Sequence, residues 1–123
     1  MILFQAFRIT GATSSIVYDE GLKSTEAEPK RLHSVAVQMN SYGGSGDNDF
    51  QLYHERAKLM EIPETMLPQC DATDTTGDNH NGPWMELPVE LDIPIGETVK
   101  AAIKCGANAV NVRGVYKYEI TGK

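Results

Sequence analysis

The stretch from residue 85 to residue 96 constrains the fold most, because apolar and polar residues alternate along its whole length. The apolar members are Met85, Leu87, Val89, Leu91, Ile93 and Ile95. A period of two is typical of a β-strand that has one face in a core and the other in water. Pro88 and Pro94 have no N–H to donate to a neighbouring strand, so we expect this strand at the edge of a sheet.

The same alternation recurs along the rest of the chain and predicts further strands. They cover residues 3–10, 16–18, 32–42, 50–55, 57–62, 99–105 and 112–121. Gly96 lies between two alternating segments, which predicts that residues 85–95 and 99–105 form a hairpin. Residues 53–60 have helical propensity, but the strand pattern around them predicts strand, turn and strand. The fold class that follows is all-β: an antiparallel β-sandwich of seven or eight strands that is jelly-roll-like.

Length and charge limit the number of domains and the kinds of partner. With 123 residues the chain has room for a single β-sandwich domain, residues 1–123. Its formal net charge of −6 disfavours neutralising phosphates, so we expect neither nucleic acid nor a membrane as a partner. The first residues lack the basic segment of a secretory signal, which indicates synthesis in a cytoplasm. Cys70 and Cys105 lack a Cys-x-x-Cys spacing, which favours free thiols and leaves one disulfide as the alternative.

The residues that carry chemistry in enzymes do not form a pattern typical of an active site. His33, His54 and His80 share no metal-ligand spacing, and the serines have no nucleophile-elbow context. The loop from Asp71 to Asn81 contains the hard oxygens that calcium selects, but its spacing does not match an EF-hand loop. We therefore expect no enzyme activity and no cofactor, with calcium in this loop as the remaining alternative.

The order of features along the chain resembles that of a known class of proteins. LHSVAVQMNSY is followed by DFQLYHERAKLMEIP, a polar loop, and WMELPVELDIPIGETVKAAIKCGANAVNVRGVYKYEI. From about Leu32 to Ile120 this order resembles small jelly-roll capsid decoration, or cement, proteins of tailed bacteriophages. The resemblance implies a structural virion protein on the capsid surface, made in the host cytoplasm. It also implies binding to the capsid protein that stabilises the shell, and a homo-oligomer, with a trimer favoured.

We expect partner contacts in the first residues and in two polar loops. The candidate contact residues are Met1, Ile2, Leu3, Phe4, Gly43, Gly44, Asp47, Asn48, Asp71, Asp74, Asp78, His80 and Trp84. The alternative is a carbohydrate- or receptor-binding β-sandwich module, such as a tail-fibre tip. In that case Trp84, Tyr42, Tyr53 and the acidic loop would line a shallow site, because sugars stack on aromatic rings.

Overall fold

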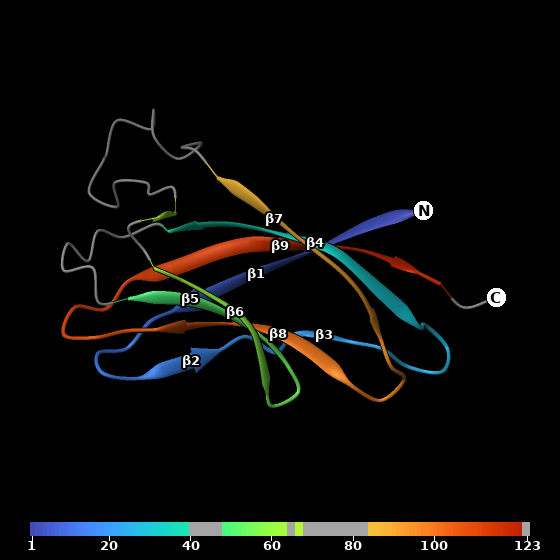
Figure 1. Cartoon of the computed structure of the whole chain (residues 1–123), viewed down its shortest axis with the longest axis horizontal. Helices are drawn as coiled ribbons and strands as arrows, with labels where there is room; N and C mark the ends of the chain where they lie inside the picture. The colour runs from blue at the N-terminus through green and yellow to red at the C-terminus, as the bar shows by residue number, and fades with distance from the viewer. Residues whose placement is uncertain (40–47, 64–65, 68–83, 122–123) are drawn as a thin grey trace.

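A computed structural model of the protein describes residues 1–39, 48–63, 66–67 and 84–121 (Figure 1). The described residues form nine β-strands and no α-helix. All strand pairs are antiparallel, and the strands form two sheets that pack face to face. The predicted fold class, an all-β antiparallel sandwich, is confirmed. The structure has one strand more than the upper predicted number.

The two sheets contain four and five strands. The four-stranded sheet has the order β1 (Ile2–Thr10), β9 (Asn111–Ile120), β4 (Lys30–Met39), β7 (Met85–Ile93). The five-stranded sheet has the order β2 (Ile16–Tyr18), β8 (Thr98–Lys104), β5 (Asp49–His54), β6 (Ala57–Pro63), and β3 (Leu22–Lys23) also pairs with β8. The chain passes from one sheet to the other at most connections, so that strands distant in sequence become neighbours.

The connections confirm two local predictions and correct a third. β7 lies at an edge, as predicted from Pro88 and Pro94, of which Pro88 lies within the strand, and β5 and β6 form the predicted strand, turn and strand around Glu55 and Arg56. The predicted hairpin of residues 85–95 with residues 99–105 is wrong, because β7 pairs with β4 whereas β8 pairs with β5. The turn at Gly96, whose φ is +91°, carries the chain to the other sheet. Alternation indicates which face of a strand is buried, but it does not indicate which strand is the neighbour in the sheet.

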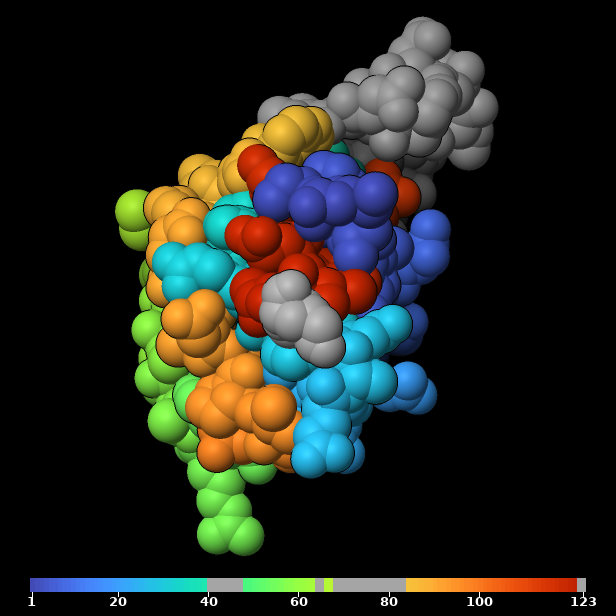
Figure 2. All heavy atoms as spheres, turned by 90° about the vertical axis from the view of Figure 1, so that its right-hand side faces the viewer, coloured from blue at the N-terminus to red at the C-terminus, as the bar shows by residue number. Residues whose placement is uncertain are grey.

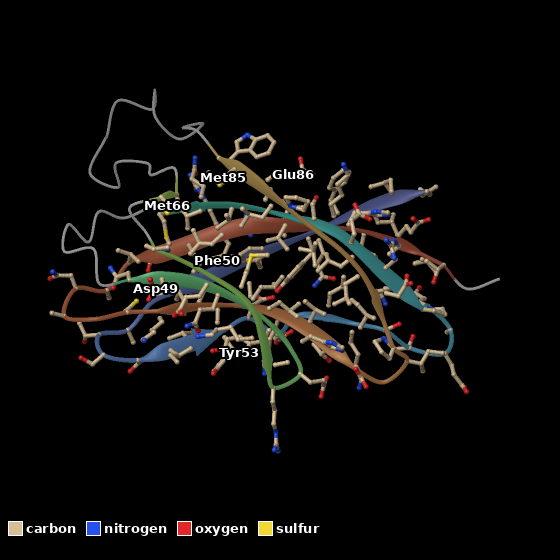
Figure 3. All side chains as sticks on the ribbon, viewed as in Figure 1. Asp49, Phe50, Tyr53, Met66, Met85 and Glu86 are labelled. Atoms are coloured by element: carbon tan, nitrogen blue, oxygen red, sulfur yellow. The ribbon has the colours of Figure 1, made fainter. Side chains whose placement is uncertain are left out.

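The hydrophobic core lies between the sheets, and a glycine in β9 makes room for one of its aromatic side chains. The Phe7 ring from β1 packs against Tyr116, with 4.9 Å between ring centroids. A Cβ at Gly114 would lie 2.0 Å from the Ala36 carbonyl oxygen and 2.6 Å from the Phe7 ring. Only glycine therefore allows Phe7 to lie across β9 at this position. Phe50 of β5 contributes to the same core from the opposite sheet (Figure 3).

Candidate binding surface

The face of the four-stranded sheet that points away from the five-stranded sheet carries the most distinctive surface, and we call it the outer face. Phe4, Ala6 and Arg8 lie on it, because they alternate with the buried Phe7 and Ile9 along β1. Glu86 of β7 lies on the same side, away from the core (Figure 3). The outer face extends between these two edge strands across β9 and β4, and a register shift between Leu32 and Ser34 interrupts the alternation along β4.

Strand register brings small residues together at the centre of the outer face. Ala6 pairs with Val115, Val115 pairs with Ala36, and Ala36 pairs with Glu86. One row of short side chains thus crosses the sheet and ends at a carboxylate. Longer side chains stand in the rows on either side, so the centre forms the floor of a hollow of about 660 Å³.

Two aromatic side chains stand at opposite corners of this hollow. Phe4 of β1 is 67% exposed, and Trp84, directly before β7, is 62% exposed. Both line the hollow together with Arg8, Arg113 and other residues. Exposed aromatic rings beside arginines are the composition typical of the central part of a protein–protein interface.

The hollow is basic, although the whole chain is acidic. Its described lining contains three cations, Arg8, Arg113 and Lys117, and one carboxylate, Glu86. The Glu86 carboxylate accepts a hydrogen bond of 2.6 Å from the Ser34 hydroxyl and lies 3.6 Å from the Lys117 amine. The Ser34 hydrogen bond, followed by the charge of Lys117, lowers the pKa of Glu86. The Lys117 charge is thus partly balanced, whereas Arg8 forms no ion pair with any described residue.

A network of ion pairs lies on the outer face, at the end of the sheet beyond Phe4. His33 lies 3.2 Å from Glu90 and 2.7 Å from Glu119 through its two ring nitrogens. Arg31 lies 3.1 Å from Glu90 and 3.0 Å from Asp92. The hydrogen bond from His33 is the main cause that lowers the pKa of Glu90. Each member of this network therefore has a hydrogen-bond or ion-pair partner within it.

The structure places the predicted contact residues in three groups. Met1, Ile2, Phe4 and Trp84 are exposed, Leu3 is half-buried, and Phe4 and Trp84 line the same hollow. Asn48 is fully buried, and its side-chain oxygen accepts a 2.8 Å hydrogen bond from the Gly106 N–H. Asn48 therefore supports the fold and is not presented at the surface. The predicted contacts Gly43, Gly44, Asp47, Asp71, Asp74, Asp78 and His80 lie outside the described residues.

The aromatic residues proposed for a sugar site do not lie on one surface. Trp84 lines the hollow on the outer face, whereas Tyr53 belongs to β5 in the other sheet. Tyr53 meets Tyr18 edge to face, with ring centroids 5.5 Å apart and planes at 66°. Tyr42 lies outside the described residues. Among the described residues, these rings provide no shared flat platform.

Several functional candidates of the outer face were missed from the sequence. The predicted contact residues did not include the small residues Ala6, Ala36 and Val115 or the cations Arg8, Arg113 and Lys117. A usable signal existed, since small residues occupy outward positions of three predicted strands where polar side chains are usual. That signal becomes a surface only when the strand order is known.

The described residues contain no group of three or more His, Cys, Asp and Glu side chains arranged to hold a metal ion. The calcium candidate loop from Asp71 to Asn81 lies outside them. Cys105 is a buried free thiol, and Cys70 is not described. His54 forms a 2.5 Å hydrogen bond with Glu97. Nothing helical in the described part of the chain has the length and hydropathy that crossing a bilayer requires.

The comparisons with known proteins do not indicate a function, so the outer face with its hollow is the basis for one. No family model, no curated protein and no solved structure matches this chain. The fold and the outer face thus define the protein as an all-β sandwich that presents an aromatic and basic hollow.

Proposed function

We propose that the protein is a non-enzymatic binding protein whose outer face docks onto another protein, and more specifically a capsid decoration protein of a tailed phage. The observation that carries the proposal is the hollow between Phe4 and Trp84. Burying these two rings against a partner would remove a large apolar area from water, which is the main favourable term in protein association. In this proposal the partner is the capsid protein, and the protein lies on the virion surface and stabilises the shell.

The connectivity of the two sheets supports the finer form of the proposal. One set of four strands has the order β1, β9, β4, β7 and the other has β2, β8, β5, β6, with the chain alternating between them. Two packed sheets of four strands each are the arrangement of a jelly roll, a fold that occurs in capsid proteins. Because a fold alone does not define a function, the outer face remains the main support.

The charge of the hollow indicates the chemistry of the partner surface. Arg8 and Arg113 flank the small-residue floor, and the chain as a whole has a net charge of −6. An acidic partner would be repelled by most of this protein but attracted to the hollow. Such local complementarity fixes the orientation of docking more than it adds affinity. We infer that the partner presents carboxylates around an apolar side chain.

The geometry favours a protein partner over the carbohydrate alternative. Phe4 and Trp84 stand on opposite edge strands of a four-stranded sheet, so they are separated by three strand spacings, or roughly 14 Å, across the sheet. Their rows lie four residues apart along β1, which adds roughly 13 Å in the perpendicular direction. A single sugar ring cannot contact both aromatic rings, whereas a protein surface can.

The test is binding to virus particles assembled without this protein. Particles from a virus whose copy of the coding sequence is deleted are mixed with purified protein and sedimented. We expect wild-type protein and the control Tyr18→Ala to sediment with the particles, because Tyr18 is exposed on β2 of the other sheet. We expect Trp84→Ala to stay in the supernatant. Failure of wild-type protein to bind particles, or equal binding by Trp84→Ala, would contradict the proposal.

A further inference from the structure

The two edges of the four-stranded sheet differ in how they are protected against pairing with another strand. The β7 edge contains Pro88, which has no N–H, and Glu90, whose φ of +52° interrupts the regular strand. Such features are typical of edges that must not pair. β1 is nine residues long, has no proline, and carries Arg8 as its one charged side chain. An edge of this length without protection is suited to strand addition.

The hydrogen-bond pattern shows which backbone groups of β1 face the free edge. Gly11 continues the β1–β9 register, and its N–H donates to the Val110 carbonyl oxygen at 3.1 Å. In an antiparallel pair, residues bonded to the neighbour alternate with residues whose N–H and C=O point away. Counting back from Gly11, the residues that point to the free edge are Ile2, Phe4, Ala6, Arg8 and Thr10. Among the described strands, none pairs with this edge.

When the β1 strand of a second copy approaches in the antiparallel direction, these five residues of one copy pair with the same five residues of the other. With a two-fold axis at Ala6, Ala6 faces Ala6 of the second copy, Phe4 faces Arg8, and Ile2 faces Thr10. The guanidinium then lies beside an aromatic ring, which is a favourable cation–π arrangement. Centring the pair on Arg8 would place two like charges opposite each other, which is unfavourable. The register centred on Ala6 is the one in which all five residues whose backbone groups face the free edge are paired in both copies.

We propose that the protein forms a two-fold dimer in which the β1 strands of two copies pair antiparallel around Ala6. The two four-stranded sheets then become one continuous sheet, and β1, which lies at the surface beside β9, becomes internal (Figure 2). Arg8 of the second copy stands next to Phe4, so each hollow gains a residue from the other copy. The self-complementary pattern of Phe4 and Arg8 identifies the occupant of this edge as a second copy of the chain.

The inference is independent of the proposed capsid role and differs from the trimer prediction. An isologous contact, in which both copies use the same surface, closes at two copies. Light scattering coupled to size-exclusion chromatography, run over a wide range of protein concentrations, measures the mass directly. We expect twice the chain mass of 13.5 kDa. A monomer at every concentration, or a trimer, would overturn the proposal, whereas capsid binding is scored separately by sedimentation.

The first variant removes hydrogen bonds at the proposed axis without removing one from the protein itself. Ala6→Pro eliminates an N–H that faces the free edge, so β1 can still pair with β9, and proline is tolerated at such edge positions. Its matched control, Ala6→Val, keeps the N–H and favours a strand. We expect Ala6→Pro to raise the dimer dissociation constant on the order of tenfold to a hundredfold, because both bonds of the central pair are lost. An unchanged dissociation constant in folded Ala6→Pro protein would overturn the proposal.

The second set of variants tests the register and does not depend on proline. Phe4→Lys places a positive charge opposite Arg8 of the second copy and should shift the protein towards monomer. Combining Phe4→Lys with Arg8→Glu places opposite charges in the same pairs and should restore the dimer. If the double variant dissociates as readily as Phe4→Lys alone, the register at Ala6 is wrong and the proposal falls.

Discussion

The Tyr116 hydroxyl donates a 2.8 Å hydrogen bond to the Asp19 carboxylate, and this bond joins the two sheets of the sandwich through the core. The same hydroxyl oxygen accepts a 2.9 Å hydrogen bond from the Ala101 N–H of β8. Asp19 donates its own N–H to the Ala101 carbonyl oxygen at 2.8 Å, so Ala101 would pair with Asp19 if β2 continued. In a continued strand the Ala101 N–H would donate to the Asp19 carbonyl oxygen, but here it donates to the Tyr116 hydroxyl instead. β2 accordingly ends at Tyr18.

Tyr116→Phe should therefore destabilise the fold. The variant keeps the ring of a fully buried residue but leaves the Ala101 N–H and one Asp19 oxygen with fewer partners. We expect the free energy of unfolding to fall by about 1–3 kcal/mol, measured by urea denaturation. Tyr118→Phe is the matched control, because Tyr118 is half-buried and its hydroxyl has no hydrogen bond to a described residue. Equal losses in both variants would contradict the role assigned to the Tyr116 hydroxyl.

Gly114→Ala should also destabilise the fold, for a steric reason. The added methyl group would lie 2.0 Å from the Ala36 carbonyl oxygen, which is backbone and cannot move without shifting β4. We expect a loss of roughly 1–3 kcal/mol in the free energy of unfolding, as for other overpacked sites. Val115→Ala on the same strand should cost less than about 1 kcal/mol, because its side chain is half exposed on the outer face. A stable Gly114→Ala protein would show that β9 and β4 separate easily.

Local patterns in the sequence predict the strands of this protein well. Apolar alternation identifies β7, and Pro88 places it at an edge because proline cannot donate to a neighbour. Alternation does not predict which strands pair, and the turn at Gly96 therefore suggested a hairpin that the structure lacks. β3 was missed because two residues are too few to show a period of two.

The binding surface was only partly predictable for the same physical reason. Phe4 and Trp84 were selected from the sequence as contact residues, but they share a hollow because β1, β9, β4 and β7 are neighbours in this order. The floor depends on register, since Ala6 meets Val115 in the unshifted β1–β9 pair, whereas Val115 meets Ala36 only because the β4–β9 register shifts between Leu32 and Ser34. Long-range register is encoded by packing between distant segments and leaves no local signal.

The lowered pKa of Glu86 predicts a specific loss of stability in acid. A carboxyl group whose folded-state pKa lies below its unfolded value stabilises the fold above that value, which for glutamate is 4.5. This stabilisation disappears as the pH falls from about 4.5 through the lowered folded-state pKa. Glu86→Gln should therefore flatten the dependence of melting temperature on pH below 4.5. Glu26→Gln is the control, because Glu26 is exposed and no described residue bonds its carboxylate. A Glu86→Gln profile parallel to wild type would contradict the prediction.

The protected edge at β7 predicts what happens when its protection is removed. Proline has no hydrogen to give to β4, so its nitrogen must face the free edge of the sheet. Pro88→Thr supplies an N–H at that edge together with a residue that favours strands, and we expect association beyond the wild-type oligomer at the same concentration. Pro88→Lys supplies the same N–H with a charge that discourages pairing, and should keep the wild-type mass. Light scattering distinguishes the two variants. If neither associates, the remaining features of β7, including the irregular backbone at Glu90, are sufficient to protect this edge, and Pro88 is not required.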